Sequence, residues 1–247
     1  MKAATRGLII GTIITLLCCS AVAQGNPYTE TVPLKRIVDD LEQTQAGVRS
    51  PVPYQVLREY RLSGAKDSRS DSEVVAEVDF RPPNSKDYRI QKSSGSGRGL
   101  QVVRRLLDHE VEAAINHGRT ALTRENYDFS YAGQATLDGQ PCYILRLRPK
   151  RNEADLITGQ VWVDGHSFVV RRIEGELAKS PSWWLRRVSV KLTFSEMGGA
   201  WLQTGMEATA DVRIVGPHTL KSRTLDYRPA SDVASAWPSL LSTPDKP

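Results

Sequence analysis

Residues 127–148 read YDFSYAGQATLDGQPCYILRLR, and they decide the class of fold. Apolar side chains take every second position on both sides of an Asp-Gly pair: Tyr127, Phe129 and Tyr131 before it, and Tyr143, Leu145 and Leu147 after it. A period of two is typical of a β-strand with one wet face and one dry face. Asp138-Gly139 between two such runs is a strong hairpin signal, because the tight turn needs positive φ. The stretch therefore predicts an antiparallel β-hairpin.

The same alternation continues on both sides of this hairpin. It predicts strands over residues 54–62, 73–80, 160–164, 167–175, 184–194, 200–206, 208–214 and 220–227, and a short one around Tyr88 and Ile90. Turn signals separate several of them, at Asp164-Gly165, Gly198-Gly199 and Gly216-Pro217. Strands joined by short turns usually pair with their chain neighbours. We predict about ten strands, mainly antiparallel, in one sheet.

Two segments have helical periodicity instead. Residues 31–45 carry apolar side chains at helical spacing, and so do residues 100–116. Glu110 breaks the second pattern, because it projects into the middle of the apolar arc of its helix. The segment Ser93–Gly99 reads SSGSGRG, a composition typical of a flexible loop.

These elements predict a fold class. A flat sheet of many one-faced strands needs a cover, whereas a strongly curved sheet partly closes on itself. We expect an α+β, mainly antiparallel β fold: a curved half-barrel, or unclosed barrel, with the helices packed on its concave side. It would span residues 24–228 as one domain, followed by a disordered tail over residues 229–247. Two sandwich-like β domains are the structural alternative.

The first 23 residues have the pattern of an export signal. The basic residues Lys2 and Arg6 precede an apolar run that ends at Cys19, and Ala21-Val22-Ala23 then gives a small-x-small cleavage site. We predict cleavage before Gln24 and a periplasmic mature protein. A lipoprotein anchor at one of the two cysteines in the run is less favoured, since neither cysteine follows a small residue.

Charge and cysteine content argue against nucleic-acid binding and against an internal disulfide. Removal of Lys2 and Arg6 with the signal lowers the formal charge from +5 to +3, which is too small to indicate nucleic-acid binding. Only Cys142 remains after cleavage, so no internal disulfide can form. Cys142 lies in an alternating segment, where a buried structural thiol is favoured over a reactive one.

Catalytic groupings are absent from the sequence pattern. His109-Glu110 opens a pair found in zinc proteases, but position 113 is Ala and not the second His that the spacing needs. The histidines lie on different predicted elements without ligand spacing. The sequence has no G-x-S-x-G motif and no phosphate loop. We therefore expect no enzymatic activity, no metal and no cofactor.

Charged residues on apolar faces are the remaining candidates for a site. Arg171 is in register with Val169 and Ile173, and Arg186 with Trp184 and Val188, so both arginines should point to the apolar face. A buried charge needs a partner, and Glu110 is the obvious one. Such a pair either fixes the helix on the sheet or orients the polar group of a ligand. The predicted ligand-binding residues are Val103, Leu106, Leu107, Glu110, Val111, Trp184 and Arg186.

The segment Gly139–Gly175 resembles a known family. It contains GQPCYILRLRPK, a strand that ends in Pro-Lys, and then GQVWVDGHSFVVRRIEG, a V-W-V-D strand with its return strand. Together with the export signal and the order of elements over residues 54–228, this is similar to the outer-membrane lipoprotein-sorting proteins, the LolA/LolB-like superfamily. The resemblance implies an unclosed barrel with a helical lid over a hydrophobic cavity that holds lipoprotein acyl chains.

Two functions follow as hypotheses. The first is a periplasmic binding or carrier protein for a lipid-like ligand or a lipoprotein acyl chain, with transient membrane association. The second is a sensor or scaffold protein of the cell envelope that uses the same fold to bind a protein partner. A carrier needs an apolar cavity with an entrance, whereas a scaffold has a filled core and an exposed patch.

Overall fold

The computed structural model describes residues 32–47, 53–64, 71–213 and 216–229. The predicted export signal with its cleavage site and the predicted tail from residue 230 lie outside the described residues. The described residues from Pro33 onward belong to one compact unit.

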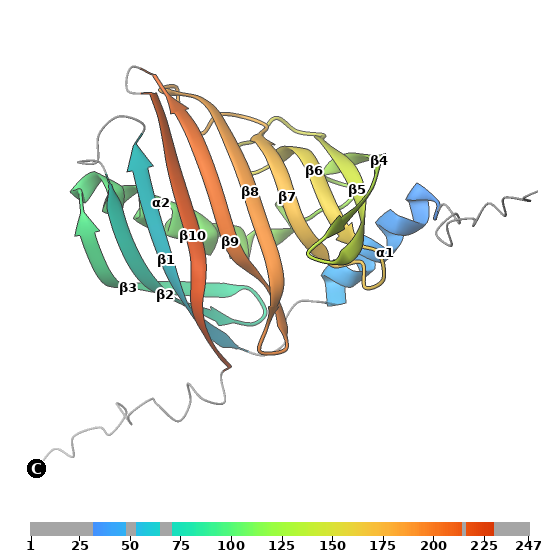
Figure 1. Ribbon diagram of the computed structural model, residues 1–247, viewed down its shortest axis with the longest axis horizontal. Helices are drawn as coiled ribbons and strands as arrows, with labels where there is room; N and C mark the ends of the chain where they lie inside the picture. The colour runs from blue at the N-terminus through green and yellow to red at the C-terminus, as the bar shows by residue number, and fades with distance from the viewer. Residues whose placement is uncertain (1–31, 48–52, 65–70, 214–215, 230–247) are drawn as a thin grey trace, which may run out of the picture. The chain divides into compact units, whose positions relative to one another are not determined.

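Ten antiparallel strands form a single open sheet (Figure 1). Their order is β3-β2-β1-β10-β9-β8-β7-β6-β5-β4, so β3 and β4 are the two edges. The strands are β1 (Tyr54–Gly64), β2 (Ser72–Arg81), β3 (Ser85–Gly95), β4 (Tyr127–Leu137), β5 (Gln140–Pro149), β6 (Ile157–Asp164), β7 (Val170–Leu177), β8 (Leu185–Met197), β9 (Ala200–Val212) and β10 (Gly216–Pro229). The predicted half-barrel is confirmed, because the sheet does not close.

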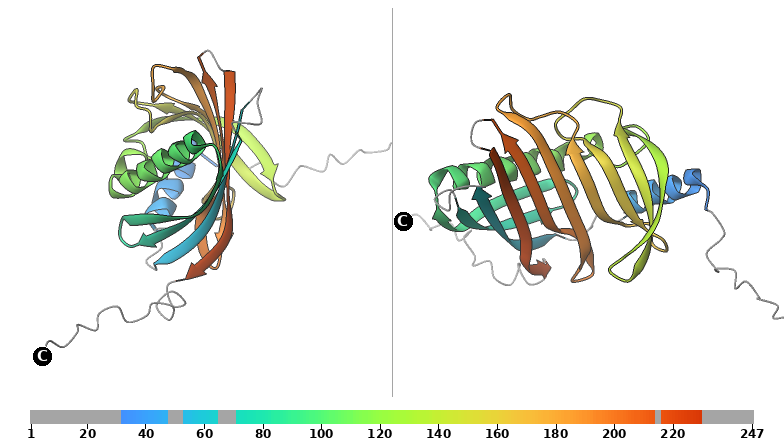
Figure 2. Two further views of the ribbon diagram at one scale, coloured as in Figure 1. Left: turned by 90° about the vertical axis from the view of Figure 1, so that its left-hand side faces the viewer. Right: turned by 45° about the horizontal axis from the view of Figure 1, so that its top comes forward.

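Two helices lie on the concave side of the curved sheet, as Figure 2 shows. α1 (Leu34–Gly47) contacts β4, and α2 (Gly97–Ile115) contacts β2 and β3. The helices therefore cover opposite ends of one face. No helix among the described residues is both long and apolar enough to cross a membrane.

The hairpin that predicted the fold forms as expected. Asp138 and Gly139 connect β4 to β5 with φ angles of 51° and 77°, which is the positive-φ geometry that the Asp-Gly pair favours. Residues 200–206 and 208–214, predicted as separate segments, belong to one long strand up to Val212. Cys142 is free and buried, as predicted.

The prediction of a flexible loop over Ser93–Gly99 is wrong. β3 continues to Gly95, and α2 begins at Gly97 with Ser96 as its N-cap, whose side chain accepts a hydrogen bond from Gly99 N. A Cβ atom at Gly99 would clash with the Ser72 side chain, so the glycine permits close packing of α2 on β2. The composition of the segment is that of a linker, but Gly95 and Gly99 permit close contact with the start of β2.

Two groups of buried apolar side chains form the interior. One lies between α2 and the first strands, with Val103 and Leu107 of the helix against Val56, Tyr60, Val74, Ala76, Val78, Ala200, Leu202 and Leu220. At the other end of the sheet, α1 buries Ile37, Val38 and Leu41, and inward positions of β5 and β6 are buried as well. Each helix thus closes its own end of the concave face.

Candidate functional site

Three charged side chains meet beneath α2. Arg58 of β1 donates a hydrogen bond from Nη1 to Glu110 Oε2 over 2.8 Å. Lys86 of β3 brings its Nζ to 3.7 Å from the same oxygen. Arg58 is inward because it shares the strand face of Val56 and Tyr60, and Lys86 lies opposite Phe80 of β2 at the start of β3. Two strands and one helix therefore supply this charge cluster.

The charge cluster is buried and carries an excess positive charge. The exposed side-chain fractions are 7% for Arg58, 20% for Glu110 and 21% for Lys86. Among the described residues, Glu110 is the one carboxylate that forms an ion pair with either cation. Two cations against one anion leave one unit of positive charge, which is costly in a medium of low polarity.

The pKa values of the cluster follow from burial and mutual attraction. Burial acts to raise the pKa of Glu110, but Arg58 and then Lys86 outweigh it and hold the pKa below its ordinary value. For Arg58, burial acts to lower the pKa, and the attraction of Glu110 reverses this and raises it. For Lys86, burial prevails and lowers the pKa. Lys86 is thus the cation that Glu110 compensates least.

Aromatic residues surround these charges. Tyr54 packs against Phe80 with ring centroids 5.0 Å apart and against Tyr227 at 5.8 Å. Tyr60 is fully buried, and its hydroxyl has no hydrogen-bond partner of good geometry. Burial, followed by the nearby Glu110 charge, raises the pKa of Tyr60 to about 12. Its hydroxyl is therefore a neutral, unused donor beside the charge cluster.

Beside the core under α2, a strip of apolar side chains lies on the concave face of β8 and β9. It consists of three opposed pairs on β8 and β9: Val188 with Ala210, Val190 with Ala208, and Leu192 with Met206. All six residues are half-buried, in contrast to the closed core under α2. The alanines leave more room than larger side chains would. The sheet centre is thus apolar but only partly covered.

The convex face is polar and nearly balanced in charge. Cross-strand ion pairs join its strands, including Lys221 with Glu207 and Lys191 with Glu174, each over 3.2 Å. A shallow hollow of about 360 Å³ lies above Gly205, and Lys191, Glu207 and Lys221 are among the residues that line it. It is open, and solvated charges line it, so this hollow resembles a polar surface groove more than a lipid cavity.

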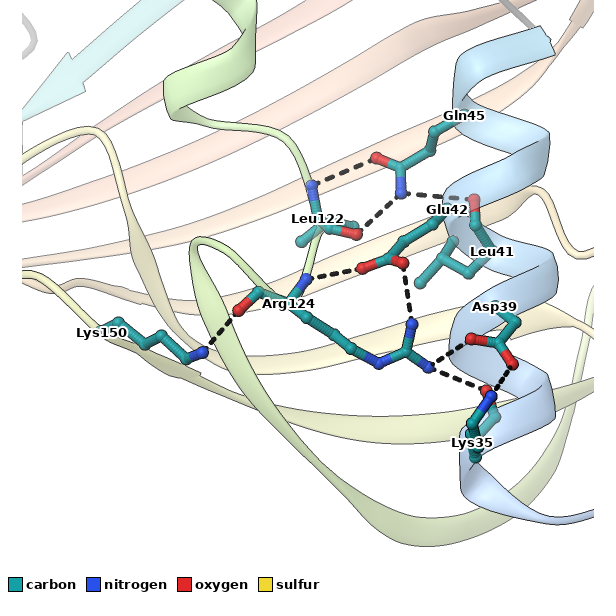
Figure 3. A network of polar contacts seen from close by, with 8 residues as sticks. All are labelled: Lys35, Asp39, Leu41, Glu42, Gln45, Leu122, Arg124 and Lys150. Atoms are coloured by element: carbon teal, nitrogen blue, oxygen red, sulfur yellow. Dashed lines mark hydrogen bonds and ion pairs between the residues drawn. The ribbon is translucent and has the colours of Figure 1, made fainter.

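The α1 end of the sheet is held by a dense polar network, drawn in Figure 3. Arg124 donates hydrogen bonds to Glu42 over 2.8 Å and to the Lys35 carbonyl over 2.9 Å, and it forms an ion pair with Asp39 over 2.8 Å. Its own carbonyl accepts from Lys150 over 2.6 Å. Both terminal nitrogens of the guanidinium therefore have partners. A second open hollow, of about 350 Å³, lies beside this network between α1 and β4.

The predicted site residues fall in different environments. Val103 and Leu107 are 1% exposed and belong to the closed core, so a ligand could reach them only if α2 moved. Leu106 and Val111 are half-buried on the same helix. Their roles as ligand contacts stay predictions. Glu110 is the predicted residue that the structure places in a charged cluster.

The prediction that Arg171 or Arg186 pairs with Glu110 is wrong. Arg171 donates from Nε to Asp164 over 2.5 Å, within its own β6–β7 hairpin. Arg186 is exposed, because the β8 bulge between Leu185 and Arg187 takes it out of the register that simple alternation predicts. Trp184, 38% exposed, lies just before β8. The structure thus does not bring Arg186 to Glu110, and the roles of Trp184 and Arg186 as ligand contacts stay predictions.

Sequence reasoning missed the two cations that pair with Glu110. The signal for Arg58 was available, since strict alternation places it between the inward Val56 and Tyr60. Lys86 gave a weaker signal, because the strand around Tyr88 and Ile90 was expected to be shorter than β3 is. No cluster of three or more potential metal-ligating His, Cys, Asp or Glu side chains occurs in the part of the chain that the structure describes.

Comparison with solved structures finds proteins of similar architecture. A domain named for outer membrane lipoprotein sorting, from Vibrio parahaemolyticus, is 13% identical with a TM-score of 0.43, and the match covers 79% of this chain and 92% of that one. A DUF1329 family protein from Desulfovibrio piger is 17% identical with a TM-score of 0.45, over 81% and 94%. A LolA superfamily protein from Nitrosomonas europaea is 11% identical with a TM-score of 0.40, over 80% and 93%.

The predicted resemblance is confirmed as a similarity of structure. At these identities and TM-scores it transfers no residue role to this chain. No protein-family model matches the sequence. No curated protein matches it either.

Proposed function

We propose that the protein is an exported binding or carrier protein for a lipid-like molecule, whose apolar part lies on the strip formed by β8 and β9. The observation that carries this proposal is the half-buried state of the six apolar residues of the strip, between the two ends of the concave face that the helices cover. Each CH₂ group that a ligand buries there contributes roughly 0.8 kcal/mol. An acyl chain of ordinary length could therefore bind without specific polar contacts.

The two faces of β8 support this assignment. Val190 points to the concave side, and its neighbour Ser189 is exposed on the opposite face. Partly exposed apolar surface is normally kept small in a soluble protein, so the half-buried strip supports the presence of an apolar ligand. The predicted export signal agrees with a role in the cell envelope, and it stays a prediction.

The test compares two variants of adjacent residues. A fluorescent fatty acid is titrated into the mature chain, residues 24–247, and into Val190→Glu and Ser189→Glu. We expect the wild type and Ser189→Glu to bind alike and Val190→Glu to bind at least tenfold more weakly, with thermal melts to confirm that both variants fold. Equal binding by the wild type and both variants would show that the ligand does not contact the strip. No binding by the wild type would overturn the proposed function.

A second candidate is the binding of a protein partner, which the edge strand β4 favours. From Phe129 to Leu137 this strand carries no charged residue, whereas the opposite edge β3 carries Lys86, Asp87, Arg89 and Lys92. Charges on an edge strand hinder pairing with another chain, so β4 is the less protected edge. An added strand would slow amide hydrogen exchange along β4, and Ala135→Lys should abolish that protection.

A further inference from the structure

The excess positive charge beneath α2 lies close to the apolar strip. Tyr60 of β1 is opposite Ser222 of β10, Ser222 is opposite Met206 of β9, and Met206 is opposite Leu192 of β8. Neighbouring strands are about 4.8 Å apart, so Tyr60 lies about 10 Å from the strip along this row. Arg58 follows on the same strand and the same face as Tyr60. A molecule on the strip therefore lies about 10 Å from the charge cluster, and its polar end reaches the cluster when α2 moves away from the buried Tyr60.

The groups of the cluster are suited to bind an anion. Arg58 and Lys86 both approach a single oxygen of Glu110, so one carboxylate faces two cations. The buried Tyr60 hydroxyl lies beside Arg58, whose guanidinium can only donate to it, so the Tyr60 O–H itself donates no hydrogen bond of good geometry. Lys86 and Glu110 each keep about a fifth of their side chain exposed, whereas Arg58 is almost entirely enclosed. The cluster thus opens to solvent on the side of Lys86.

We propose that the charge cluster of Arg58, Lys86 and Glu110, together with the Tyr60 hydroxyl, binds one anionic group, and that the ligand of the strip is an anionic amphiphile with a carboxylate or phosphate at its polar end. This inference rests on the proposed function for its apolar part. An anion would neutralise the charge that Glu110 leaves uncompensated and would satisfy the Tyr60 donor. Neutral lipids would leave both unsatisfied.

The experiment uses a fluorescent fatty acid and its methyl ester as a matched pair of probes. Each is titrated into the wild-type mature chain, Lys86→Gln, Lys86→Arg and the control Lys92→Gln, which changes a lysine on the same strand that is 67% exposed. We expect the wild type and Lys92→Gln to bind the acid about tenfold more tightly than the ester. Lys86→Gln should lose this preference without weaker ester binding, and Lys86→Arg should retain it.

The outcomes separate the two proposals. Equal affinity of the wild type for acid and ester, or an unchanged preference in Lys86→Gln, would overturn the anion site and leave amphiphile binding standing. No binding of either probe would overturn amphiphile binding. In that case, inorganic phosphate is titrated alone by calorimetry to test the anion site. Phosphate binding that Lys86→Gln abolishes would show that the cluster binds a free anion. No phosphate binding would overturn the anion site as well.

Discussion

The two helices on the concave face are fixed by charged residues in opposite ways. At the α1 end, Arg124 is matched by Asp39 and Glu42, and it remains 43% exposed. At the α2 end, Arg58 and Lys86 share Glu110 alone and are largely buried. A balanced surface network holds a helix in place at little cost, whereas an unbalanced buried one lowers stability unless something else binds there. This difference supports the proposal that the polar end of a ligand binds at the α2 end, whereas the network at α1 holds the helix in place.

The largest effect is expected from Glu110→Gln. The substitution leaves two buried cations without an anion, and we expect a loss of about 3 kcal/mol in the free energy of unfolding by urea. The control Glu112→Gln, exposed on the same helix, should change it by less than about 0.5 kcal/mol. If the cluster binds an anion, Glu110→Gln should also bind the fatty acid more tightly, because a competing negative charge is gone. Weaker stability with unchanged acid binding would instead indicate a purely structural ion pair.

Asp164→Asn provides a comparison with Glu110, because Asp164 is a buried carboxylate whose charge is satisfied by several donors. Asp164 accepts hydrogen bonds from the backbone N–H groups of His166 and Ser167 and from Arg171, and these outweigh burial and lower its pKa from 3.8 to about 2. The stabilisation from a lowered carboxylate pKa is complete above the unfolded pKa and disappears as the pH falls through the folded one. We expect the variant to be about 2 kcal/mol less stable near neutral pH.

The pH dependence provides the control for this variant. The difference between wild type and Asp164→Asn in urea unfolding should shrink as the pH falls from 3.8 towards 2. A difference that stayed constant over that range would show that lost hydrogen bonds, and not the carboxylate charge, cause the destabilisation.

A pair of glycines tests how α2 is anchored. Gly99→Ala places a Cβ against the Ser72 side chain, and we expect a cost of about 1 to 2 kcal/mol from the forced shift of the helix start. Gly97→Ala meets nothing within 4 Å and should leave the protein equally or slightly more stable. Thermal melts of both variants provide the measurement. Equal melting temperatures would mean that the start of α2 is not fixed by this contact.

The smallest effect is expected at the α1 end. Glu42→Gln removes one of the acidic partners of Arg124, but Asp39 still pairs with it over 2.8 Å. We expect a loss of about 0.5 kcal/mol in urea unfolding, further reduced by salt. A loss as large as that of Glu110→Gln would break the contrast between the two ends.

The fold was predictable because its signals are local. A period of two and an Asp-Gly pair are properties of short segments, and they predicted the β4–β5 hairpin and most strands. The site was less predictable because it depends on tertiary contacts. The bulge at Arg186 shifts a side chain by one position, which reverses its face and cannot be seen in alternation alone. The Gly-Ser segment before α2 packs closely for reasons that only Ser72 reveals.

Native mass spectrometry of the mature chain, purified without detergent and followed by organic extraction, tests the central claim most directly. The account predicts a bound molecule with an acyl chain and an anionic group, absent from Val190→Glu and depleted in Lys86→Gln. A neutral lipid retained equally by the wild type and Lys86→Gln would contradict the anion site. Ligand-free protein that also fails to take up the fluorescent fatty acid would contradict amphiphile binding on the β8–β9 strip.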